Sequence, residues 1–207
     1  MDIEATVSCL NVLGGLLYLP PDDESLTPVF KVFSDPYWTS SWPCGDKEAL
    51  SAIHELISGQ PHEPQDLKEA HGELFVGKEP LSGHLKAPPW GSVYTDAQRE
   101  MFGQSTQKLR AFLGEQGLEI KRNNDEPEDH IGLLLLTAAW LGVARREKAL
   151  SSLLQDHVLP WAPTYFSLLK AASPHPFYQG IADLAALTLD TLRRERNLEV
   201  MELNLHQ

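Results

Sequence analysis

The sequence contains little cysteine and no pattern typical of a disulfide scaffold. Only two of its 207 residues are cysteines, Cys9 on a segment with helical apolar spacing and Cys44 in a loop, and no Cys-x-x-Cys pair occurs. One disulfide could join them, but a small secreted fold held together by disulfides would carry more cysteines. The first four residues also lack the basic segment that begins a signal peptide. These features predict a cytoplasmic protein.

Long hydrophobic runs and common catalytic motifs are absent too. The longest apolar candidate, residues 131–144, is shorter than the roughly 18 residues of a membrane-spanning helix, so we expect no stable membrane insertion. There is no Gly-x-Ser-x-Gly elbow, no Gly-x-Gly-x-x-Gly fingerprint and no Gly-x-x-x-x-Gly-Lys phosphate loop. These absences favour a binding protein over an enzyme, and we expect no cofactor.

Basic residues are fewer than acidic residues in this sequence. The chain has 17 lysines and arginines against 29 aspartates and glutamates, which gives a formal net charge of −12 with neutral histidines. An acidic surface repels nucleic acid phosphates and anionic lipid headgroups, so neither is expected as a partner. The surface would instead attract a basic ligand. The same acidity can also serve only to maintain solubility, and composition leaves both interpretations open.

Apolar residues recur at steps of three and four along nearly the whole chain, which is the spacing of amphipathic helices. No convincing strand-turn-strand pattern, internal repeat or low-complexity tract is present. The pattern predicts an all-α fold, a single-domain helical bundle over residues 1–207 with a long proline-rich loop. Thr95 or Asp96 is expected to cap the fourth helix. The predicted helices lie near residues 3–18, 50–57, 67–75, 101–113, 131–143, 148–157, 161–169 and 177–192.

The proline-rich loop covers residues 77–91, with three prolines and three glycines, and Gly77 is placed like a helix C-terminal cap. Loops this long inside a compact domain tend to be functional or disordered. Prolines leave acceptor carbonyls free, and Trp90 adds a large apolar face with one donor, so the loop could form a wall of a peptide-binding groove together with Leu74 and Phe75. A packed loop that plugs the end of the bundle explains it equally well.

The stretch Glu126-Pro-Glu-Asp-His130 precedes the most hydrophobic predicted helix, residues 131–143. An ordinary helix start explains most of it, with Asp125 or Glu126 as N-cap, Pro127 in the first turn and acids at the positive end of the dipole. His130 fits less well, because helix N-termini disfavour a cation. Since the helix is apolar nearly all round, we expect it to be the central buried one.

A metal-dependent hydrolase is a second interpretation of the same stretch. Carboxylate and imidazole groups are metal-ligand types, so Glu126, Glu128, Asp129 and His130 could bind a metal ion. However, no second spaced pair such as His-Glu-x-x-His is present, and we expect no metal site.

At these stretches the sequence resembles the TorD/DmsD family of redox-enzyme maturation chaperones. The matching stretches occur in the expected order over most of the chain. They are Leu74-Phe-Val-Gly77, Pro88-Pro-Trp-Gly-Ser-Val-Tyr94, Phe102-Gly-x-Ser-Thr106, Glu126-Pro-Glu-Asp-His-Ile-Gly132, Ala138-Ala-Trp-Leu141, Leu159-Pro-Trp161 and His175-Pro-Phe-Tyr178.

The resemblance implies a cytoplasmic chaperone that is not an enzyme. Its partner would be the twin-arginine leader peptide of a molybdopterin-dependent reductase catalytic subunit of the dimethyl sulfoxide reductase type. It would hold this leader for cofactor insertion and proofreading before export by the twin-arginine translocase, a further possible partner. A nitrate-reductase-type assembly chaperone, which acts on the mature subunit, is the alternative within the family.

By motif match, the resemblance also implies which residues bind the leader. Asp129 and neighbouring acids would face the paired arginines, with which carboxylates form strong charge-assisted hydrogen bonds. Leu74, Phe75 and Trp90 would contact the apolar half of the leader. The full predicted set is Leu74, Phe75, Pro89, Trp90, Pro127, Asp129 and His130.

Overall fold

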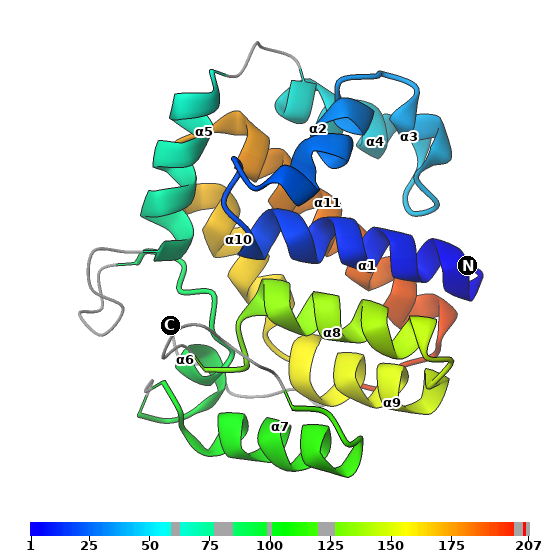
Figure 1. The fold of residues 1–207 in the computed structure, drawn as a ribbon, viewed down its shortest axis with the longest axis vertical. Coiled ribbons are helices and arrows are strands. Elements are labelled where there is room, and N and C mark those ends of the chain that lie inside the picture. Colours follow the sequence, from blue (N-terminus) through cyan, green and yellow to red (C-terminus); the bar gives the residue numbers. More distant parts are fainter. Residues whose placement is uncertain (59–62, 77–84, 99–100, 120–126, 201–204, 206–207) are drawn as a thin grey trace.

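A computed structural model describes residues 1–58, 63–76, 85–98, 101–119, 127–200 and 205. Within these ranges the regular structure is entirely helical, and the sole β-type pairing is an isolated antiparallel bridge between Trp90 and His130 (Figure 1). The all-α prediction is confirmed. Cys9 and Cys44 are both buried free thiols, so the disulfide that could be drawn between them is not formed.

The first part of the chain supplies five helical segments. Asp2 caps the first of them, since its side chain accepts a hydrogen bond from Ala5 N–H at 2.7 Å. Prolines 20 and 21 follow this helix, as expected for residues that cannot continue it. The segments are α1 (Ile3–Tyr18), the 3₁₀ turn η1 (Glu24–Leu26), α2 (Thr27–Phe33), α3 (Trp38–Ser41) and α4 (Lys47–Ser58).

The predicted helix over residues 67–75 is two segments joined without a break. Helix α5 (Pro64–His71) continues into η2 (Gly72–Val76), a π-helical turn. Leu74 and Phe75 in that turn are buried. The predicted cap at Gly77 lies outside the described residues.

Helices α6 (Ser92–Thr95) and α7 (Gln104–Glu115) follow the loop, and the predicted cap between them is wrong in position. Thr95 and Asp96 end α6, whereas α7 begins after Gly103. Asp96 nevertheless serves α7 from outside the helix. Its two carboxylate oxygens accept from Ser105 N–H at 3.1 and 3.2 Å, and it also accepts from the Ser105 hydroxyl at 2.9 Å. Asp96 therefore caps an amide of α7 as expected from its side chain, but it does so from outside the helix, across the turn before it.

Helix α8 (Ile131–Val143) starts later than predicted. Asp125 and Glu126, the predicted N-caps, lie outside the described residues, and Pro127 precedes the helix instead of lying in its first turn. The N-cap is His130. The helix starts later because the residues before it pair with the segment around Trp90, which is distant in the sequence.

Helix α8 lies beside α1, and the two backbones approach closely where Gly14 faces Gly132 (Figure 1). A Cβ atom on Gly132 would lie 2.8 Å from the Gly14 carbonyl oxygen, so glycine is required at this crossing. Eight residues of α8 are buried, as expected of the central helix, but along one edge Trp140 is 46% and Val143 67% exposed.

The last part of the chain completes the core. The longest helix, α11, packs against α4 and α10, and ten of its residues are buried. The predicted helices near residues 148–157, 161–169 and 177–192 are confirmed to within a few residues at each end. The segments are α9 (Glu147–Ser152), the π-helical η3 (Leu153–Val158), α10 (Ala162–Ala172) and α11 (Pro176–Glu195).

Candidate functional site

The proline–tryptophan loop and the start of α8 are held together by backbone hydrogen bonds. Ile131 N–H donates to the Pro89 carbonyl at 2.8 Å, and Gly91 N–H donates to the Asp129 carbonyl at 3.1 Å. The carbonyl of a proline thus satisfies the first amide of a helix, as free proline carbonyls allow. These contacts bring two motifs that lie about 40 residues apart in the sequence into one structural unit.

His130 acts as a neutral cap in this unit. Its ring Nδ1 accepts from Gly132 N–H at 3.2 Å, and the ring lies edge-on to Tyr18, with the centroids 5.2 Å apart. The Trp90 ring lies 6.2 Å away on another side. Burial lowers the pKa of His130 to about 3. The imidazole is therefore uncharged and an acceptor, which explains why a histidine can occupy a helix N-terminus.

Asp129, one residue earlier, is a buried carboxylate with incomplete hydrogen bonding. Its Oδ2 accepts from Ser92 N–H at 2.6 Å and from the Thr106 hydroxyl at 3.3 Å. Its Oδ1 is buried and has no partner within the described part of the chain. Burial raises the pKa of Asp129 against the effect of these hydrogen bonds. An unpaired buried acceptor is costly, so this oxygen is available for a donor from a ligand.

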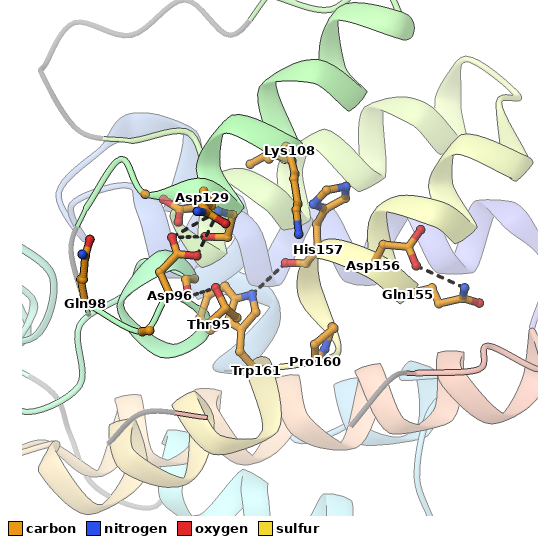
Figure 2. Close-up of a pocket in the computed structure, with 16 residues that line it drawn as sticks. Thr95, Asp96, Gln98, Lys108, Asp129, Gln155, Asp156, His157, Pro160 and Trp161 are labelled. Carbon is orange, nitrogen blue, oxygen red and sulfur yellow. Dashed lines mark hydrogen bonds between the residues drawn. The ribbon is translucent and has the colours of Figure 1, made fainter. Parts of the chain in front are cut away.

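A pocket of about 660 Å³ adjoins Asp129 (Figure 2). Its floor and walls come from the α6–α7 connection, from α7, from η3 and from the turn that leads into α10. The lining residues are Gly91, Thr95, Asp96, Ala97, Gln98, Gly103, Gln104, Ser105, Lys108, Leu109, Asp129, Gln155, Asp156, His157, Pro160 and Trp161.

Trp161 forms the rigid side of this pocket. Its ring stacks on Tyr94 at 5.5 Å between centroids, with an interplanar angle of 12°, and its Nε1–H donates to the His157 carbonyl at 2.7 Å. A Cβ on Gly91 would lie 2.8 Å from that indole, so the glycine allows the loop to approach it. Burial lowers the pKa of His157, which leaves this ring neutral beside the aspartates.

The predicted site residues separate into two groups. All seven are buried: Leu74, Phe75, Pro89, Trp90, Pro127, Asp129 and His130. Pro89, Trp90, Asp129 and His130 meet in the unit described above, and of the seven predicted residues only Asp129 lines the pocket.

Leu74 and Phe75 belong to a neighbouring cluster. Phe75 packs against His71, 5.0 Å between ring centroids, and against Tyr178 at 5.5 Å. Burial lowers the pKa of His71 to about 4, so it packs as a neutral ring. A positive charge on His71 would lower the pKa of His130, so the two groups lie within electrostatic range of each other.

Sequence reasoning missed the far wall of the pocket. Lys108, Asp156 and His157 carry no local motif, and they reach the pocket from helices that only the fold brings together. A metal site receives no support from the described residues, among which no three His, Cys, Asp or Glu side chains could hold an ion. Glu128 instead accepts from Arg110 Nε at 2.9 Å, and Glu126 lies outside the described ranges.

The overall fold is shared with a solved candidate redox enzyme maturation protein from Archaeoglobus fulgidus, with a TM-score of 0.51 at 17% identity, over 85% of this chain and 90% of the other. At that identity the likeness shows the fold alone. Within the described part of this chain, no helix has the length and apolarity to span a bilayer.

Sequence comparison is more specific. The family model described as nitrate reductase delta subunit matches residues 40–167. A Tat proofreading chaperone DmsD of Salmonella typhi is 37% identical over 179 residues, which cover 86% of this chain and 84% of the relative. The chaperone protein YcdY of Escherichia coli is 29% identical over 184 residues, 87% of this chain and 89% of the relative.

The relatives that cover most of both chains are named chaperones, and this chain falls in the same class. The chain belongs to the TorD/DmsD family, which the nitrate reductase delta subunit model describes. The resemblance predicted from the sequence motifs is confirmed.

Proposed function

We propose that this protein is a chaperone that binds the twin-arginine signal peptide of a molybdopterin-dependent reductase catalytic subunit of the dimethyl sulfoxide reductase type. It holds the precursor for cofactor insertion and proofreading before export. The similarity to Tat proofreading chaperones over most of both chains is the observation that carries this function. The alternatives, a nitrate-reductase-type assembly chaperone and a metal-dependent hydrolase, are not favoured.

Asp129 is the residue best placed to contact the leader. Asp129 lines a pocket with acidic walls and has one oxygen without a partner among the described residues, and a guanidinium group offers several donors to such an acceptor. We infer that Pro89, Trp90, Pro127 and His130 position the Asp129 segment, because they are buried around it.

The apolar half of the leader needs a different surface. Leu74 and Phe75 are buried, but Val76, the next residue of η2, is 53% exposed. We propose that the hydrophobic stretch contacts η2 at this point, with Leu74 and Phe75 shaping the wall behind it.

The proposed role sets the location and the further partners. A leader is available for binding before export, so the protein acts in the cytoplasm, and it releases the precursor to the twin-arginine translocase. It has no catalytic residues in this role. We further infer that residues 1–207 fold as one helical domain.

Isothermal titration of the purified protein with a synthetic peptide tests this function. The peptide carries two adjacent arginines followed by an alternating leucine–alanine stretch, and a matched peptide replaces both arginines with glutamines. We expect binding of the first peptide and much weaker binding of the second. Equal or absent binding would contradict the proposal. Titration with a reductase subunit that lacks its leader separates the nitrate-reductase-type alternative, which requires undiminished binding.

A further inference from the structure

The charges that line the pocket are strongly unequal. Among the described residues that line it, three aspartates, Asp96, Asp129 and Asp156, face a single lysine, Lys108. His157 adds no positive charge, because its pKa is lowered by burial. The pocket is thus net acidic, and a low-dielectric wall such as Trp161 strengthens its attraction for a cation.

The three aspartates are not equivalent. Asp96 is committed to the first turn of α7 through its bonds to Ser105. Asp129 keeps one buried oxygen without a partner among the described residues. Asp156 is exposed and accepts a long 3.3 Å hydrogen bond from the side chain of its neighbour Gln155. Two carboxylates, Asp129 and Asp156, are therefore available to a ligand.

These two carboxylates lie on opposite sides of the pocket. Figure 2 shows Asp129 beside Asp96 on one side and Asp156 beside Gln155 on the other, with Lys108 between them in that view. Asp129 comes from the segment before α8, whereas Asp156 comes from η3. A ligand with a single cationic group would satisfy one side, while a ligand with two adjacent cationic side chains could satisfy both.

We propose that the pocket separates the two arginines of the leader, with Asp129 accepting from one guanidinium and Asp156 from the other. This inference rests on the proposed function and adds to it the residue that recognises the second arginine. Lys108 also lines this pocket, and the arginine pair displaces its side chain. The pocket therefore selects for paired arginines over a single cation.

A titration with matched variants tests the assignment. Asp156→Asn removes the charge at the exposed side, and Glu55→Gln removes one charge from the exposed face of α4, at the other end of the molecule (Figure 1). Asp156→Asn should weaken binding of the two-arginine peptide by up to about 5-fold, which is the effect expected from losing one exposed ion pair. Glu55→Gln should leave the affinity unchanged. Lys108→Gln should tighten binding by about 2- to 5-fold, because it removes repulsion within the pocket.

Two further peptides, each with one arginine replaced by glutamine, complete the test. The effect of Asp156→Asn should vanish with one of them and persist with the other. If the wild type binds the two-arginine peptide but Asp156→Asn and Glu55→Gln behave alike, the arginine assignment is wrong while the chaperone function stands. If the wild type binds no peptide, the proposed function itself fails. Circular dichroism of each variant shows whether its fold is intact.

Discussion

The carboxylate of Asp129 accepts a 2.6 Å hydrogen bond from the backbone N–H of Ser92, which lies 37 residues earlier in the chain. This bond holds the loop after Trp90 against the segment before α8. It uses one carboxylate oxygen and leaves the other without a partner among the described residues, and Asp129 also lines the pocket.

Asp129→Asn should separate these two roles. The asparagine side-chain oxygen can still accept from Ser92, but the negative charge is lost. Because burial raises the pKa of Asp129, its charged form destabilises the folded protein at neutral pH. We therefore expect an unchanged or higher free energy of unfolding, together with about 10- to 100-fold weaker binding of the two-arginine peptide. Urea unfolding and peptide titration measure the two effects. Lower stability with normal binding would mean that Asp129 is a purely structural residue.

The buried histidines predict a loss of stability in acid. Their pKa values are lowered to about 4 for His71 and about 3 for His130, whereas the unfolded chain has values near ~6.5. Below about pH 6.5 the unfolded state binds more protons, so the free energy of unfolding falls by about 2 kcal/mol per imidazole on reaching about pH 5. His71→Phe keeps an aromatic ring beside Phe75 and removes one of the two groups. We expect the fall between about pH 7 and about pH 5 to be smaller by about 2 kcal/mol in this variant. An equal fall in both proteins would show that His71 is not the titrating group.

The α1–α8 crossing predicts which glycine cannot be replaced. Gly132→Ala places a Cβ against the backbone of Gly14, so it should lower the free energy of unfolding by about 1–3 kcal/mol. Gly114→Ala in α7 is the matched control, because no atom lies within 4 Å of the added Cβ. It should be neutral or stabilising by up to about 1 kcal/mol. Thermal unfolding of both variants tests this. Similar unfolding midpoints for Gly132→Ala and Gly114→Ala would rule out the close crossing of α1 and α8.

The helices could be predicted from the sequence because apolar spacing is a local signal. The last helix shows this. Leu187 is half-buried, and the other members of its predicted stripe are buried, namely Phe177, Ile181, Leu184, Thr188 and Leu192. The start of α8 could not be predicted in the same way. An acid and a proline before an apolar run are typical of an N-terminus, but pairing with Pro89 and Gly91 keeps residues 127–130 outside the helix.

Part of the candidate site could also be predicted from the sequence. The two motifs that meet at Trp90 and His130 could be recognised by resemblance, but nothing local shows that Trp90 would be 1% exposed. The far wall of the pocket forms only when η3 and α7 pack near Asp129. This tertiary packing leaves no local signal in the sequence. Asp156 and Lys108 therefore look like ordinary surface charges in the sequence.

Hydrogen–deuterium exchange with and without the two-arginine peptide tests most directly whether the leader binds at this pocket. If it does, exchange slows in residues 92–96, 104–109 and 155–161, which surround the pocket, and changes little in α4. Asp129→Asn should reduce this protection at the same peptide concentration. If the peptide binds but protects another surface and leaves exchange in these three segments unchanged, the leader does not bind at this pocket.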